Sequence, residues 1–303
     1  MPKTARVERR DNVSAFPRGA QLVTFVNQGG NFFELPIQID LIFGEEHVSD
    51  ETGFGFSLRF RKCFLRLKLD RCQIINSTPR YQTTLPPEDF VQLVKRTIQK
   101  SRDASGKIGA SVDGLLSKVL SSVGLEGALG GSIEKTMQNL EMDEYKSTIK
   151  YRIVEPTAGD SWRIGHEVLG DPRTLDQTLS GQYFRDKSDN TKEEAEDATA
   201  LCAVGPDSEL QKTYEVGVMI SCTFKDGVYL PIVENEDADL MPNSLDWRSS
   251  NRLKIEKLMM LKAIRDDQIK NGWDVHEGEL IISHAKIKVR ISDAEQDNMR
   301  ENL

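Results

Sequence analysis

The sequence predicts a mainly β protein (β+α): an antiparallel β-sandwich of jelly-roll-like character, with a helical insertion at about residues 86–140 and one further helix at about 250–271. Three observations lead to this class. Many short segments alternate apolar and polar residues with the period of two expected for half-buried strands. These segments follow one another in runs instead of alternating with helices, which argues against a doubly wound parallel sheet. Helical spacing is confined to two regions.

The first β region begins shortly after the N-terminus, with a short strand predicted at 21–26. Residues 34–43 (ELPIQIDLIF) alternate cleanly, and their apolar residues share one face: Leu35, Ile37, Ile39, Leu41 and Phe43. This pattern is typical of a strand with one buried face. Pro36 near its beginning favours a strand start or a sheet edge.

Residues 53–72 (GFGFSLRFRKCFLRLKLDRC) contain two apolar sets of opposite parity. The even-numbered set ends at Phe60, and the odd-numbered set begins at Cys63. A single straight strand cannot bury both sets, because a shift of one residue reverses every side chain. We therefore expect a β-bulge or a sharp bend at 61–64, with Arg59, Arg61, Arg66 and Lys68 pointing away from the core.

A change of pattern at residues 84–141 predicts the helical insertion. Prolines at its start are followed by apolar residues at steps of three and four, the spacing of one helix face. A second amphipathic run follows and is interrupted by the glycine-rich segment 124–131.

The second β region contains strands predicted at 147–155, 161–168 and 214–224. Asp226-Gly227 then predicts a hairpin turn into 228–233, because this dipeptide favours the turn types that join two adjacent strands. A helix is predicted at 251–270, ended by Asn271-Gly272. The last strand, 279–291, turns Ile281, Ala285, Ile287, Val289 and Ile291 inward.

Two divisions into domains fit these elements. Residues 1–19 are polar and basic and are interpreted as an arm or a flexible tail. Residues 20–303 then form a single discontinuous β-sandwich domain with the insertion at 84–141, in which the last strand could pair with an early one. The alternative is two domains, 20–140 and 141–303.

Composition restricts the compartment and the class of partner. The formal net charge of −8 argues against a nucleic-acid-binding surface over the whole molecule. The four cysteines form no CxxC pair, and Cys63 and Cys222 lie in apolar runs, so we interpret them as buried free thiols. No secretory signal or membrane-spanning stretch is recognisable, and we expect a cytoplasmic or other reducing intracellular location.

A search for catalytic patterns finds none. The Gly-Lys at 106–107 lacks the glycine and hydroxyl spacing of a phosphate-binding loop, and no GxSxG segment is present. His47 and His276 have neighbouring carboxylates but not the spacing of two metal ligands on one element. We therefore predict no catalytic residues, metal or cofactor. If the protein were an enzyme with dispersed residues, Trp162, His166 and Glu167 would be the first candidates, although His166 fits a buried core position.

The leading hypothesis is a non-enzymatic binding or assembly protein that uses charged strand and loop surfaces. Cationic strands and acidic loops on one molecule suit a charged protein partner or self-association into an oligomer, scaffold or shell. The candidate binding residues are the cations of residues 53–72 and of the last strand: Arg59, Arg61, Lys62, Arg66, Lys68, Lys286, Lys288 and Arg290.

Two alternatives remain open. If the cationic strands are neighbours, these residues and Lys150 and Arg152 could form a ladder for nucleic acid or another phosphate-rich partner. Few aromatic residues accompany the cations, which does not favour nucleic acid. The amphipathic segment 106–133 could act on membranes, but it lacks the aromatic anchors and most of the cations of interfacial helices, so packing within the protein is preferred.

Overall fold

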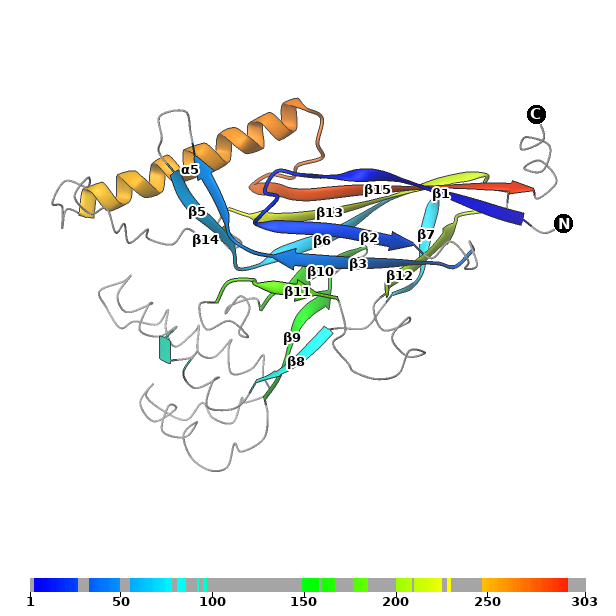
Figure 1. Ribbon diagram of the computed structural model, residues 1–303, viewed down its shortest axis with the longest axis horizontal. Helices are drawn as coiled ribbons and strands as arrows, with labels where there is room; N and C mark the ends of the chain where they lie inside the picture. The colour runs from blue at the N-terminus through cyan, green and yellow to red at the C-terminus, as the bar shows by residue number, and fades with distance from the viewer. Residues whose placement is uncertain are drawn as a thin grey trace.

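The structure is a computed structural model that describes residues 3–26, 33–49, 55–77, 81–85, 92, 95–96, 149–157, 160–166, 177–184, 200–208, 210–224, 228–229 and 247–293. The described part is mostly β, and its strands pair antiparallel in three sheets (Figure 1). Buried residues of all three sheets belong to one continuous hydrophobic core. The predicted mainly β, antiparallel, sandwich-like class is confirmed.

The largest sheet has seven strands in the order β1-β15-β13-β6-β10-β9-β8. Their bounds are Lys3–Ser14 for β1, Glu279–Asp293 for β15, Thr213–Thr223 for β13, Cys63–Asp70 for β6, Ser161–Ile164 for β10, Ile149–Pro156 for β9 and Tyr81–Leu85 for β8. Strands from both sides of residue 140 therefore share one sheet. The last strand pairs with β1, a segment for which the sequence predicted an arm and not a strand.

The second sheet has five strands in the order β11-β3-β12-β7, with β2 also paired to β3. Their bounds are Gly181–Tyr183 for β11, Leu35–Phe43 for β3, Ala200–Pro206 for β12, Cys72–Ser77 for β7 and Ala20–Val26 for β2. A third, three-stranded sheet joins β14 (Val228–Tyr229), β5 (Gly55–Phe60) and β4 (Glu46–Ser49).

Alternating burial in the longest strands confirms their predicted faces. In β3 the buried residues are the five apolar ones expected from the sequence, and in β13 Tyr214, Val216, Val218, Ile220 and Cys222 are buried. Of the five inward positions predicted for β15, Ala285, Ile287, Val289 and Ile291 belong to the core, whereas Ile281 is buried outside it, because the register shift pairs it with Ser221 and places Leu280 and Ile282 in the core. Burying one such aliphatic side chain contributes about 1.5–3 kcal/mol, so these alternating rows fix which face of each strand turns outward.

The parity change in residues 53–72 marks a transfer between sheets. Phe56, Leu58 and Phe60 are buried from β5, and Cys63 and Leu65 are buried from β6. A bend at residues 61–62 separates the two strands, which belong to different sheets. The predicted bend is confirmed, and it allows both apolar sets to enter the same core.

The predicted helix is α5, Trp247–Lys270, whose C-terminal end lies near the start of β15 (Figure 1). Gly272 ends it with a φ of 77°, a left-handed conformation that glycine adopts without strain. The main-chain N–H groups of Gly272 and Trp273 donate to the carbonyls of Ile269 and Gln268, both at 3.0 Å. This cap turns the chain sharply, and residues 271–278 return it to the start of β15.

Two predictions fail in the described residues. The arm or tail expected at 1–19 is a strand over Lys3–Ser14, because β15 offers it a complementary edge for main-chain hydrogen bonds. The hairpin pairing expected between 214–224 and 228–233 is not found among the described residues, since Val228 and Tyr229 of β14 pair with β5, and Asp226 and Gly227 lie outside those residues. The helical insertion at 84–141 lies outside the described residues, apart from 84–85 at the end of β8 and positions 92 and 95–96. The segment 106–133 also lies outside them.

Candidate functional site

The candidate site is the outward face of the seven-stranded sheet where β6, β13 and β15 lie side by side. The strand register sets its side chains in rows, because paired residues of antiparallel strands share a face. Lys68, Gly217 and Lys286 form one row, and Met219 stands between Arg66 and His284 in the next. A third row aligns Asp70, Glu215 and Lys288. We call the surface formed by these nine residues the outer face.

A groove of about 880 Å³ lies on the outer face. Its floor is formed by β6, β13 and β15, and one wall is formed by Asn271–Asp274 and His276, which follow α5. The charged residues lining it are three cations and four carboxylates: Arg66, Lys68 and Lys286, and Asp70, Asp160, Glu215 and Asp274. The groove is therefore nearly balanced in charge, in contrast to a uniformly basic ladder.

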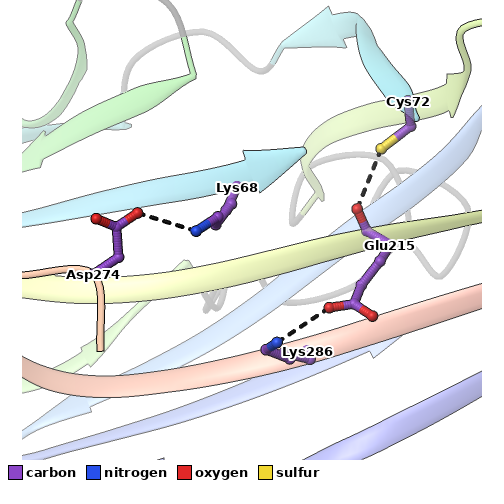
Figure 2. A network of polar contacts seen from close by, with 5 residues as sticks. All are labelled: Lys68, Cys72, Glu215, Asp274 and Lys286. Atoms are coloured by element: carbon purple, nitrogen blue, oxygen red, sulfur yellow. Dashed lines mark hydrogen bonds and ion pairs between the residues drawn. The ribbon is translucent and has the colours of Figure 1, made fainter. Parts of the chain in front are cut away.

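Most of the cations on this part of the sheet form ion pairs with carboxylates of the same molecule. Lys68 Nζ lies 3.1 Å from an Asp274 carboxylate oxygen, and Lys286 Nζ lies 3.3 Å from Glu215 Oε1 (Figure 2). Arg66 pairs with Glu279 at the start of β15. Beyond the groove, Arg290 pairs with Glu8 of β1 at 3.2 Å. The hydrogen bond from Lys68 is the main cause of the lowered pKa of Asp274.

The glycine at position 217 leaves the middle of the groove floor open. A Cβ atom built there would lie 3.3 Å from the Cβ of Lys68, so a side chain would fill the space between two ion-paired lysines. Two residues further along β13, Met219 also lines the groove, and it pairs with His284 of β15. The floor thus combines a small apolar centre with charged margins.

One aromatic pair forms the wall nearest to α5. The rings of Trp273 and His284 meet edge to face with their centroids 4.5 Å apart. Burial, and next the positive charge of Lys286, lower the pKa of His284. The imidazole is therefore held in its neutral form at neutral pH, and it contributes an aromatic ring to the wall, while its buried Nδ1 has no hydrogen-bond partner among the described residues.

The structure separates the predicted binding residues into two sets. Five lie on the outward side of the seven-stranded sheet: Arg66, Lys68, Lys286, Lys288 and Arg290. The cationic strands are not direct neighbours, because β13 lies between β6 and β15, and β10 lies between β6 and the β9 positions of Lys150 and Arg152.

The other three predicted binding residues do not line the groove. Arg59 belongs to β5 and pairs with Glu45 at 2.5 Å. Arg61 and Lys62 lie half-buried at the bend between β5 and β6, with Lys62 Nζ 5.8 Å from the centroid of the Phe64 ring. Since Phe64 pairs with Ser221 of β13, Lys62 lies beside the outward side of β6 but outside the lining of the groove.

Sequence reasoning missed the carboxylates and the aromatic wall. Glu215 is the polar residue between two inward apolar positions of β13, and this alternation could have identified it. Asp274 and Trp273 follow the helix cap, and nothing local shows that they approach Lys68, a strand residue 206 positions away from Asp274. Such a contact depends on strand order, which the sequence does not reveal.

Two of the three enzyme candidates are placed in the interior. Trp162 of β10 is buried, and His166, which follows this strand, is buried as expected for a core histidine. Neither lines the groove. Glu167 lies outside the described residues. Within the part of the chain that the structure describes, no group of three or more His, Cys, Asp or Glu residues is arranged to hold a metal ion.

Comparisons with known proteins do not identify the chain. No protein-family model matches it, and no curated protein sequence matches it. Among the helices of the described residues, none is both long and apolar enough to cross a membrane. Function is therefore inferred from the geometry of the outer face.

Proposed function

We propose that this protein is a non-enzymatic binding protein that holds a protein segment in the groove of the outer face. The observation that carries the proposal is the combination of an 880 Å³ groove with three cations and four carboxylates around an apolar floor. A peptide segment offers the matching features, since it has charged side chains of both signs, main-chain hydrogen-bonding groups and apolar side chains.

Charge pairing favours such a partner over a polyanion. A phosphate-rich ligand binds mainly through cations whose counterions it releases. Here Lys68 and Lys286 each have a carboxylate within 3.3 Å, so a phosphate would have to displace an intramolecular partner. The remaining acids of the lining, Asp70 and Asp160, would also repel it. A protein segment can instead exchange ion pairs with both signs of charge.

Two variants test the groove directly. Gly217→Phe fills the floor, and the double change Glu215→Lys with Lys286→Glu reverses the polarity of the pair while keeping it paired. Each is compared with Lys288→Ala, which lies outside the lining of the groove. The wild-type protein and the control, each with a photo-crosslinking residue at Met219, are expected to crosslink one discrete partner protein. Gly217→Phe leaves less room for the bound segment, and the double change places like charges against it. The yield of the crosslinked product should therefore fall at least about tenfold in both groove variants.

The outcome that would overturn the proposal is equally direct. If the groove variants are folded, as recognised by unchanged circular dichroism, and yield the same crosslinked products as the wild type, the groove is not the binding site. Retardation of nucleic acid at low salt that is lost at high salt and in Lys286→Glu would instead support the phosphate-binding alternative.

A further inference from the structure

Strand β1 forms one edge of the seven-stranded sheet. It pairs with β15 on one side, and in the part of the chain that the structure describes no strand pairs with its other side (Figure 1). With twelve residues it is the longest edge strand among those described. An unpaired edge offers a row of main-chain N–H and C=O groups to another strand.

The charges on β1 are incompletely matched within one molecule. In the β1–β15 register Arg6 stands directly opposite Arg290, and Glu8 stands opposite Lys288. Arg290 turns to Glu8, at 3.2 Å, and not to Arg6. Like charges directly opposite one another destabilise a strand pair. The exposed Arg6 would therefore gain from a carboxylate supplied across the other edge of β1.

We propose that β1 pairs antiparallel with β1 of a second copy of this chain, about a twofold axis through Val7. In this register Arg6 stands opposite Glu8 of the second copy, Glu8 stands opposite its Arg6, and the two Val7 residues stand opposite each other. Thr4 and Ala5 then pair with Arg10 and Arg9 of the second copy. Two opposite-charge pairs form, and no like charges are opposed.

Registers with the twofold axis through a neighbouring residue of β1 either oppose like charges or form no charge pair. With an axis through Arg6, Arg9 or Arg10, that arginine stands opposite the same arginine of the second copy. With an axis through Glu8, the two Glu8 residues stand opposite each other. An axis through Ala5 creates no charge pair. The register with β15 is uninterrupted from Lys3 to Arg10, and the register shift between Arg10 and Val13 ends this regular part of β1. Among the axes through residues of this stretch, the charge pattern selects the one through Val7.

The pairing would extend the sheet across two molecules. Paired residues of antiparallel strands share a face, so the outer faces of both copies would turn to the same side. Each copy would keep its own groove, because β13 and β15 separate β1 from β6. This inference does not rest on the proposed function, since Arg6, Val7 and Glu8 do not line the groove.

Charge-reversal variants of the full chain test the register. Sedimentation over a concentration series should show a dimer for the wild type. Arg6→Glu would oppose acids to acids across the axis, and Glu8→Arg would oppose arginines to arginines, so each variant should dissociate at least about tenfold more readily. An equimolar mixture of the two variants should restore a dimer, because both acids of the Arg6→Glu chain then stand opposite the two arginines of the Glu8→Arg chain.

A matched control separates this effect from net charge. Lys212→Glu changes the net charge by the same amount as Arg6→Glu at an exposed position outside β1, and it should dimerise like the wild type. Arg6→Glu should not weaken the fold, because it places an acid opposite Arg290. A wild-type protein that stays monomeric, an Arg6→Glu variant that dimerises like the wild type, or a mixture that fails to pair would each overturn the proposal.

Discussion

At the scale of single residues, buried polar groups show most directly how the fold is held. Glu46 is almost fully buried, and its Oε2 accepts main-chain hydrogen bonds from Arg18 at 2.7 Å and Gly19 at 3.1 Å. These two N–H groups belong to the turn that connects β1 to β2. A charge-assisted acceptor there stabilises the turn more than a neutral one would.

Glu46→Ala would leave both N–H groups without that acceptor in a buried place. We expect the free energy of unfolding to fall by about 1–3 kcal/mol, the cost of unsatisfied buried donors. Urea denaturation measures the change. The neighbouring Glu45→Ala removes an ion pair with the partly exposed Arg59, and its effect should stay below about 1 kcal/mol. Equal losses for the two variants would contradict this assignment.

His284 makes the stability of the protein dependent on pH. Burial and the nearby Lys286 lower its pKa from the ordinary value of 6.5, so the unfolded chain binds a proton at a higher pH than the folded one. The stabilising contribution is therefore complete above about pH 6.5 and is lost as the pH falls through the folded-state pKa.

His284→Gln should make the decline in stability below about pH 6.5 shallower than in the wild type. Urea titrations at each pH give the slope, and His276→Gln, which changes an exposed histidine near the same groove, serves as the control. The same slope in wild type and His284→Gln would show that His284 does not cause the dependence.

At the scale of elements, α5 and β15 are joined by one buried side chain. Gln268 Nε2 donates to the carbonyl of Ile281 at 2.7 Å, and Gln268 Oε1 accepts from the N–H of Ile281 at 3.1 Å. The register of β13 and β15 shifts at this position, between the pairs Ile220–Ser283 and Ser221–Ile281. The helix thus supplies hydrogen bonds where a bulge disturbs the ladder.

Gln268→Ala would remove both hydrogen bonds from a side chain that is only 4% exposed. A loss of about 2 kcal/mol in the free energy of unfolding follows from leaving a buried N–H and C=O unsatisfied. Lys262→Ala, at an exposed position of the same helix, should change stability by less than about 0.5 kcal/mol. Chemical denaturation of both variants measures the change in the free energy of unfolding. A Gln268→Ala variant that is as stable as the wild type would show that this side chain does not join the two elements.

The elements also show how far the sequence determines the fold. Long strands such as β3 and β13 were predictable because their apolar faces enter a shared core. The edge strand β1 was not, because its charged pattern resembles a tail until β15 is known to pair with it. For the candidate site, Lys68 was predictable as an outward cation, but its pairing with Asp274 was not, since the two residues are 206 positions apart.

At the scale of the whole molecule, the four cysteines are distributed so that they report on its cooperative units. Cys63 and Cys222 lie in the seven-stranded sheet, and Cys72 and Cys202 lie in the five-stranded sheet. All four are free and buried, which confirms the interpretation of Cys63 and Cys222 as buried thiols. Burial raises the pKa of each thiol, to about 12 for Cys72 and Cys202.

Because the thiolate is the reactive form, none of the four should react with a maleimide at neutral pH until the chain opens. If strands from both sides of residue 140 form one cooperative unit, all four should be labelled at one common rate, set by global opening. Mass spectrometry of peptides from a labelling time course gives the four rates. Two separate domains at 20–140 and 141–303 would instead group Cys63 with Cys72 and Cys202 with Cys222. Grouping by sheet, with Cys72 and Cys202 reacting first, would show that the five-stranded sheet opens alone and would contradict the single cooperative unit.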